Sequence, residues 1–182
     1  MRIRQVDDDA RLFLVEDILH EEHLREIQKI NWMEQELYKC EFQQHMKYRF
    51  HLKPWNERVN HLNSYVREQI IHINEKLGLS LPESFGVWWI DTPGAHTSIH
   101  TDGTLSEAMQ LYFVAPNENH GTVFFHYKNI DTVKYRFKSI PNTGYIMDNK
   151  PREDGAHPLL WHGLVNPVPP NTIRVSNYIP RQ

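Results

Sequence analysis

The chain has 182 residues, a length that suits one domain with a buried core. Its hydrophobic fraction of 40% and aromatic fraction of 12% exclude a disordered chain. The net charge of −3 gives no support for broad binding to nucleic acid or to an anionic membrane surface, so we expect neither as a partner. Cys40 is the only cysteine, which excludes an internal disulfide and a thiolate metal cluster.

The chain also lacks the sequence features of a targeted or membrane-bound protein. Residues 1–10 are polar and contain Asp7-Asp8-Asp9, without the apolar core of a signal peptide. No later apolar run approaches the length of a membrane-spanning helix. We therefore expect a cytoplasmic protein, and the sequence gives no indication of its oligomeric state.

The first part of the chain is predicted to be mainly helical. Residues 11–15 form a first strand, a helical pattern follows from Glu16 to Ile30, and residues 32–52 are ambiguous and partly helical. The clearest helix spans residues 56–77 and is followed by Gly78, a typical helix terminator. Its apolar side chains recur at helical spacing, at Val59, Leu62, Val66, Ile70, Ile73 and Leu77.

After the last helix the hydrophobic period changes from helical to extended. Strands are predicted at residues 84–90, 108–114, 122–127, 134–139, 144–147, 159–164 and 172–179, and residues 97–102 are short and extended. Short strands broken by Gly, Pro and Asn predict a double-sheet jelly roll or a barrel, with the helix 56–77 packed across one sheet. We expect one domain over 1–182, with a helical support region in 1–80 and a β core in 81–182.

His100 and Asp102 form the first candidate pair of metal ligands. Residues two apart in an extended segment point to the same face, so the imidazole and the carboxylate share one space. The spacing alone is a weak signal, because His20-Glu21-Glu22 has it too, at a place where a helix should begin. The pair at 100 and 102 differs because it follows Pro93-Gly94 and lies between predicted strands.

Two later residues extend this hypothesis. His162 lies in an apolar predicted strand, where the ordinary alternative is a core histidine with a backbone partner. Residues 172–179 alternate, so Arg174, Ser176 and Tyr178 share one face. That face either meets solvent on an edge strand or points into a barrel mouth, where a guanidinium fork can bind a carboxylate.

The order of these residues along the chain resembles the Fe(II)/2-oxoglutarate-dependent dioxygenases, over roughly residues 84–180. Gln110-Leu111-Tyr112-Phe113 followed by Gly121-Thr122-Val123-Phe124 is similar to the prolyl-4-hydroxylase-like branch of that superfamily. The AlkB-type nucleic-acid demethylases instead carry a second arginine six residues after the first, a position that Pro180 occupies here.

The resemblance implies a mainly β protein with N-terminal helices, in which a double-stranded β-helix (a cupin-like jelly roll) has helices packed on one sheet. It also implies a hydroxylase that uses Fe(II), 2-oxoglutarate and O2 and releases succinate and CO2. Carried over residue by residue, the catalytic iron ligands would be His100, Asp102 and His162. Arg174 would pair with the far carboxylate of 2-oxoglutarate, with Ser176 beside it and Tyr112 as a further donor.

The substrate is not specified by these residues. By the resemblance, the leading candidate is a protein or peptide side chain, proline among them, and a free amino acid or other small molecule is the alternative. Trp88 and Trp89 alternate in direction, so we expect one in the core and the other beside the pocket, and the loop 149–158 is a candidate lid. A non-enzymatic cupin-like protein that binds another metal or ligand is the competing class, and an oxygenase that needs no 2-oxo acid is a third.

Overall fold

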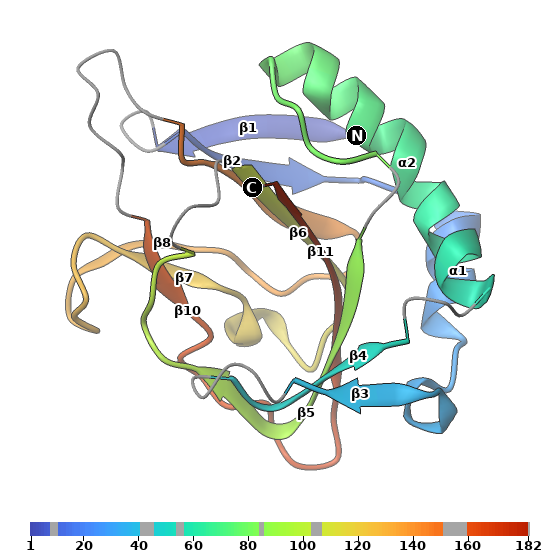
Figure 1. Cartoon of the computed structure of the whole chain (residues 1–182). Coiled ribbons are helices and arrows are strands. Elements are labelled where there is room, and N and C mark those ends of the chain that lie inside the picture. The colour runs from blue at the N-terminus through green and yellow to red at the C-terminus, as the bar shows by residue number, and fades with distance from the viewer. Residues whose placement is uncertain are drawn as a thin grey trace.

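The computed structural model describes residues 1–7, 11–40, 46–53, 57–83, 86–102, 107–150 and 160–181. These residues form three layers (Figure 1). An eight-stranded sheet lies in the middle, a three-stranded sheet lies on one side of it and the helices lie on the other (Figure 1). All strand pairs among the described residues are antiparallel.

The large sheet has the strand order β1-β2-β9-β6-β11-β5-β4-β3. Its strands are β1 (Arg2–Asp7), β2 (Leu12–Glu16), β3 (Leu37–Lys39), β4 (Met46–Leu52), β5 (Val87–Thr97), β6 (Glu107–Val114), β9 (Thr143–Asp148) and β11 (Arg174–Arg181). The small sheet has the order β10-β7-β8. Its strands are β7 (Val123–Phe125), β8 (Val133–Arg136) and β10 (Trp161–Gly163). The helices are α1 (Glu21–Gln28) and α2 (Glu57–Leu77), with the short 3-10 turns Trp32–Glu34 and Glu118–His120.

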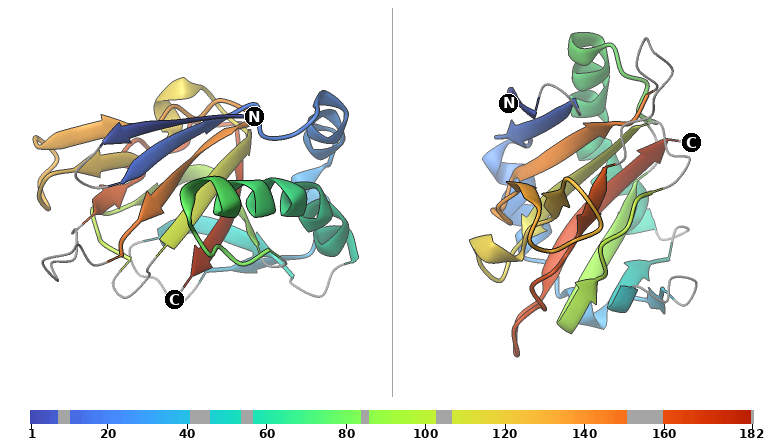
Figure 2. Two further views of the ribbon diagram at one scale, coloured as in Figure 1. Left: turned by 90° about the horizontal axis from the view of Figure 1, so that it is seen from above. Right: turned by 90° about the vertical axis from the view of Figure 1, so that its left-hand side faces the viewer.

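The predicted apolar stripe of α2 is buried against the large sheet. Figure 2 shows this helix running along one side of the strands. Side chains of β5, β6 and β11 that point to this side join it in one core cluster, among them Trp88, Ile90, Leu111, Val175 and Ile179. Because side chains alternate along a strand, their neighbours face the small sheet. None of the described helices is long and apolar enough to span a membrane.

The second core lies between the two sheets. It combines Tyr112, Tyr145 and Tyr178 of the large sheet with Phe124 and Leu160 from the other side. Two facing antiparallel sheets with a shared core are the predicted jelly-roll arrangement. The alternation predicted for the last strand is confirmed, because Ile173, Val175 and Ile179 pack in the helix-side core and Tyr178 in the inter-sheet core. That strand is not at an edge, since β11 lies between β5 and β6.

The first part of the chain contains more strand than predicted. Residues 1–80 contribute β1 to β4 to the large sheet as well as two helices. Among the described residues of 32–52, the partly helical interpretation holds for the 3-10 turn Trp32–Glu34, whereas Leu37–Lys39 and Met46–Leu52 are strands. In Met46–Leu52 apolar residues alternate with polar ones, a period of two that belongs to a strand. His20-Glu21-Glu22 does open a helix, with both acids exposed in its first turn.

β5 also departs from the prediction, because it does not end at Pro93-Gly94. The strand continues to Thr97 through an irregularity in which residues 92–95 lie opposite Tyr48 alone. Gly94 has φ +86, a left-handed conformation that glycine adopts without steric strain. Beyond this bend β5 stays paired with β4, but its other edge leaves β11 for the segment 164–168, to which Thr97 and Gly94 donate backbone hydrogen bonds.

The packing of α2 gives a first prediction, on stability. Ile73→Ala should lower the free energy of unfolding by about 2 to 5 kcal/mol, because the buried side chain would leave a cavity in the helix-side core. Urea unfolding followed by circular dichroism measures the change. His72→Ala, at the exposed neighbouring position, is the control. Equal stabilities of the two variants would show that this face of α2 contributes little to the core.

Candidate metal centre and anion pocket

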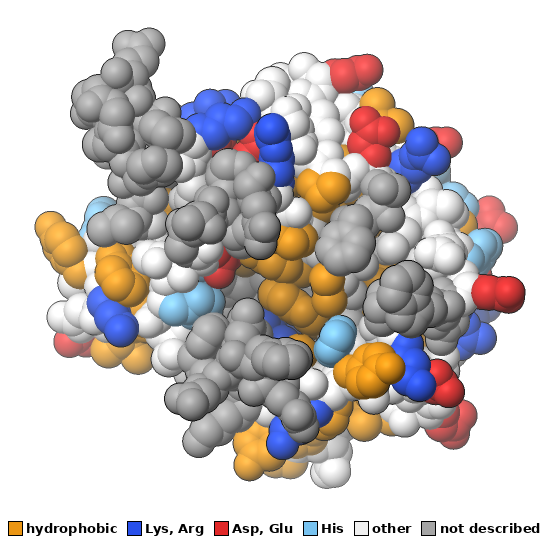
Figure 3. All heavy atoms as spheres, viewed as in Figure 1, with side chains coloured by type: hydrophobic (Ala, Val, Ile, Leu, Met, Phe, Trp, Pro, Cys, Tyr) orange, Lys and Arg blue, Asp and Glu red, His pale blue; other side chains and the backbone are white. Residues whose placement is uncertain are grey.

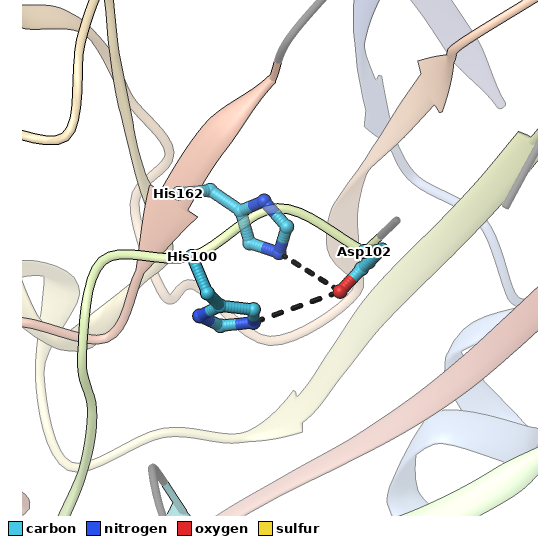
Figure 4. Close-up of side chains that lie close together, drawn as sticks. All are labelled: His100, Asp102 and His162. Atoms are coloured by element: carbon cyan, nitrogen blue, oxygen red, sulfur yellow. Dashed lines mark ion pairs between the residues drawn. The ribbon is translucent and has the colours of Figure 1, made fainter. Parts of the chain in front are cut away.

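Two histidines 62 positions apart in sequence meet through their backbones. The amide nitrogen of His100 donates to the carbonyl oxygen of His162 at 2.9 Å, and the reverse bond measures 2.8 Å. Their rings and the Asp102 carboxylate converge on one point (Figure 4). The Nε2 atoms of both histidines lie 3.6 Å from Asp102 Oδ1. One ligand atom from each residue lies within 4.8 Å of the others, so the three can hold one metal ion.

The backbone fixes the tautomer of both rings. Nδ1 of His100 lies 2.6 Å from the carbonyl oxygen of Ser98, and Nδ1 of His162 lies 2.9 Å from that of Leu160. A carbonyl oxygen only accepts, so each Nδ1 carries a hydrogen and donates it. In the neutral ring the lone pair then belongs to Nε2, the atom that faces Asp102. Burial lowers the pKa of His162, which favours this neutral form.

Tyr178 orients the carboxylate. Its hydroxyl donates to Asp102 Oδ2 at 2.7 Å, which leaves Oδ1 toward the histidines. Burial alone would raise the pKa of Asp102, but His162, His100 and the Tyr178 hydroxyl outweigh it and lower the pKa to about 2. Asp102 is therefore an anion at neutral pH. Trp89 stacks on the Tyr178 ring, with the centroids 4.4 Å apart, and holds it in place.

The triad lies in a pocket between the two sheets. The lining residues are Arg49, Trp89, Thr97, His100, Asp102, Gln110, Thr122, Tyr145, His162, Gly163, Leu164, Arg174 and Tyr178. On the face shown in Figure 3, hydrophobic side chains gather near the centre, and acidic and basic side chains are scattered toward the periphery. The lining thus brings the cluster of His100, Asp102 and His162 together with Arg49 and Arg174 in one pocket.

The two arginines belong to a row of three charges across neighbouring strands. In the register of the large sheet, Asp91 of β5 lies opposite Arg49 of β4 and opposite Arg174 of β11. Arg49 donates from Nε to Asp91 Oδ1 at 2.6 Å and from Nη2 to Oδ2 at 3.0 Å. Arg174 donates to Oδ2 from Nε at 2.8 Å and from Nη2 at 2.5 Å. All three side chains are buried.

These charges remain ionised inside the protein. Burial alone would raise the pKa of Asp91, but the two guanidinium groups outweigh it and hold the pKa below its usual range. Asp91 is thus a buried anion between two guanidinium groups. A guanidinium group that lines a pocket can bind a carboxylate.

The three residues predicted to bind 2-oxoglutarate differ in their position relative to the pocket. Arg174 lines the pocket, but Ser176 and Tyr112 are not among its described lining residues. The Ser176 hydroxyl accepts from Gln110 Nε2 at 3.0 Å. The Tyr112 hydroxyl donates to Thr122 Oγ1 at 3.0 Å, and its ring lies under the Arg174 guanidinium, 5.8 Å from Cζ to centroid. Both residues thus reach the pocket through neighbours that do line it.

Sequence reasoning missed several pocket residues. Arg49 falls in the segment that was interpreted as partly helical. Asp91 carried a usable signal, since it is a lone acid directly after the apolar run Val-Trp-Trp-Ile. The alternation at the two tryptophans is confirmed, because Trp88 packs in the core and Trp89 lines the pocket. Of the candidate lid 149–158, residues 151–158 lie outside the described ranges.

Comparisons with known proteins agree with this geometry at the level of the fold. No protein-family model and no curated protein matches the chain. A prolyl hydroxylase from Trichoplax adhaerens, solved with a peptide fragment of the hypoxia-inducible factor oxygen degradation domain, matches with TM-score 0.64 and 11% identity over 97% of this chain and 84% of that one. A Pseudomonas putida prolyl-4-hydroxylase matches with TM-score 0.60 and 14% identity over 95% and 94%. OsALKBH1 matches with TM-score 0.63 and 11% identity over 100% of both chains.

These solved structures are Fe(II)/2-oxoglutarate oxygenases. The chain therefore has the jelly-roll fold of that class, which confirms the predicted fold. Identities of 11% to 14% carry the likeness no further than the fold, so substrate and activity have to be argued from the site.

The row of charges gives a second stability prediction. Asp91→Asn should lower the free energy of unfolding by about 3 to 5 kcal/mol, because two buried guanidinium groups would be left around a neutral amide. Adding Arg49→Gln should recover part of this loss, because only one guanidinium then remains in the row. Urea unfolding measures both variants, with Asp131→Asn at an exposed turn as the control. A loss no larger than that of the control would show that the three charges are not coupled.

Proposed function

We propose that this chain is an Fe(II)/2-oxoglutarate-dependent dioxygenase that hydroxylates a C–H bond and releases succinate and CO2. One observation carries the proposal. Two imidazole Nε2 atoms and one carboxylate oxygen converge in a pocket that is also lined by two buried arginines. The oxygenase fold supports the same conclusion.

The donor set fits Fe(II). Two histidines and one carboxylate on one side of a metal leave open positions, which is typical of non-haem iron oxygenases. In this proposal the ligands are His100, Asp102 and His162, each already oriented by a hydrogen bond to Ser98, Tyr178 or Leu160. When bound, the iron supplies the redox chemistry with O2, and the protein supplies position and shielding from water.

The other end of the pocket fits the far carboxylate of 2-oxoglutarate. A carboxylate buried without a partner is strongly destabilised, and Arg174 offers it a charged donor. Arg174 has five N–H hydrogens, of which three bind Asp91 and the carbonyl oxygen of His120. Ser176 and Tyr112 would act by supporting Gln110, Thr122 and Arg174, which line the pocket.

A protein or peptide side chain is the substrate class that we propose, with proline as the first candidate. The support is the likeness to prolyl hydroxylases, one of them solved with its peptide. A free amino acid or other small molecule is the alternative within the same class of enzyme. A panel of peptides and free amino acids, each tested for stimulation of succinate release, separates the two.

Turnover tests the enzyme assignment directly. The purified protein is loaded with Fe(II) without oxygen, then given O2 and 2-oxoglutarate, and succinate is measured. We expect succinate from the unchanged chain and at most background from His100→Ala, Asp102→Ala and His162→Ala, because each removes one of only three protein ligands. His126→Ala, an exposed histidine outside the pocket lining, is the matched control. Equal succinate from the triad variants would overturn the assignment, and a bound metal without any turnover would favour the non-enzymatic alternative.

The Tyr178 hydroxyl gives a separate prediction on metal affinity. Tyr178→Phe removes the donor to Asp102 Oδ2 and frees the carboxylate to turn away from the histidines. Loss of such an outer partner typically weakens metal binding by about 10- to 100-fold. Competition with a chelator under anaerobic conditions measures the affinity for Fe(II), and Tyr127→Phe at an exposed position is the control. An affinity equal to that of the control would remove Tyr178 from this role.

A further inference from the structure

Three aromatic side chains form a row across neighbouring strands of the large sheet. Tyr38 of β3 lies opposite His51 of β4, and His51 lies opposite Trp89 of β5. The rings of Tyr38 and His51 are 5.6 Å apart between centroids. Arg49, which lines the pocket, is two residues from His51 in the same strand, so the row lies on the pocket face of the sheet. We call Tyr38, His51 and Trp89 the aromatic row.

The aromatic row leads from the pocket to the surface. Trp89 lines the pocket and is half-buried, His51 is half-buried, and Tyr38 is 45% exposed. Figure 1 shows β3 and β4 on the opposite side of the view from β7, β8 and β10 of the small sheet. When a large substrate places one residue in a pocket, the rest of it has to lie on the surface that continues from that pocket.

The inner end of the row is held rigidly. Tyr178 stacks on Trp89 with the centroids 4.4 Å apart, and the guanidinium carbon of Arg49 lies 4.2 Å from the centroid of the same ring. The hydroxyl of Tyr178 binds Asp102, so the indole is joined through one packed ring to the metal centre. A surface whose side chains already have one position costs a ligand little ordering entropy on binding.

The charge beside the row is balanced. Lys53 Nζ lies 5.3 Å from the centroid of the Tyr38 ring and 3.1 Å from Glu36 Oε2. Burial lowers the pKa of His51, which favours the neutral imidazole. Single-stranded nucleic acids also stack on aromatic rings, but they do so in grooves whose positive charge follows the phosphates. A peptide segment without charge therefore fits this surface better than a nucleic acid does.

We propose that the aromatic row docks the segment of a peptide substrate that flanks the reacting residue. The inference rests on the proposed function, and it names the surface that would select the substrate. In this arrangement the segment runs across the strands. One apolar side chain lies on Tyr38, and the reacting residue enters the pocket beside Trp89.

The spacing of the strands sets the period of that segment. Neighbouring strands are about 4.8 Å apart, so Tyr38 and Trp89, two strands apart, are separated by about 10 Å along the row. A polyproline II segment advances about 9 Å in three residues and then presents the same side again. A β-strand instead does so after two residues and about 7 Å. The row thus fits a segment in the polyproline II conformation with apolar residues three positions apart.

Peptide binding without turnover tests the docking role. Two fluorescein-labelled decamers share one composition, alanine and serine with two prolines, in the order Pro-x-x-Pro in one and Pro-x-Pro in the other. The third probe is a labelled oligothymidine of ten nucleotides. Each probe is titrated into the full chain without oxygen, with and without Fe(II), and fluorescence anisotropy gives the dissociation constant.

We expect the Pro-x-x-Pro decamer to bind more tightly than the Pro-x-Pro decamer. Tyr38→Ala and His51→Ala should each weaken its binding by roughly 3- to 10-fold, the range for a lost aromatic contact, and should remove the preference. Tyr38→Phe keeps the ring and should retain both. Tyr127→Ala removes an exposed tyrosine outside the row and serves as the control. Because Tyr38 is exposed on the edge strand β3, its variants should fold, which circular dichroism confirms.

Two results would overturn the inference for a peptide. One is equal binding of both decamers to the unchanged protein, or an equal loss in Tyr38→Ala and Tyr127→Ala. The other is tighter binding of oligothymidine that Tyr38→Ala weakens, which would assign the row to a single-stranded nucleic acid.

Succinate release keeps this inference separate from the proposed function. Succinate release by a protein that does not distinguish the two decamers removes only the docking role. A preference for Pro-x-x-Pro that depends on Tyr38, without succinate from any substrate, supports the docking surface and removes the enzyme assignment.

Discussion

The reciprocal backbone hydrogen bonds between His100 and His162 are the constraint on which the candidate site depends. They join the segment after β5 to β10, and so connect the end of a strand of the large sheet to the small sheet. The bend at Pro93-Gly94 makes this crossing geometrically feasible, because β5 pairs with β11 before it and with the segment 164–168 after it. In both histidines the Nδ1 atom donates to the carbonyl oxygen two residues earlier. The backbone bonds therefore set the positions of the two rings, and these carbonyl groups set their tautomers.

Polar side chains form a hydrogen-bonded network in the core between the two sheets. Gln110 receives hydrogen bonds from Tyr145 and Thr122 and donates to Ser176, and Thr122 in turn binds Tyr112. A network of this kind is stable in a dry interior only when its groups find partners, as these do. Its effect is to give the wall of the pocket one fixed arrangement, against which the guanidinium of Arg174 rests.

The sequence predicted the cluster of His100, Asp102 and His162 better than it predicted the row of Arg49, Asp91 and Arg174. His100, Asp102 and His162 could be found because a two-residue spacing and the order of a few polar residues in apolar strands are visible along the chain. Arg49 and Asp91 could not be paired in the same way, because their contact depends on which residues face each other across β4 and β5. An irregular stretch of four residues opposite one sets that register, and strand periodicity carries no trace of it. Ser176 lies on the predicted face, but it contacts Gln110, which lines the pocket, and is not itself among the described lining residues.

The two ends of the pocket are connected through side chains of the same few strands, and this has a consequence for how a ligand would be held. Arg49 and Arg174 flank Asp91 across β4, β5 and β11, while Trp89 of β5 and Tyr178 of β11 carry the contact on to Asp102. Three hydrogen-bonded strands cannot move apart without breaking their ladder, so the sheet fixes the charged row relative to Tyr178, whose hydroxyl holds the Asp102 carboxylate. A ligand that spans the distance between them with a negative group at each end gains both interactions without reordering the protein, which is how a rigid scaffold favours one length of dicarboxylate over others.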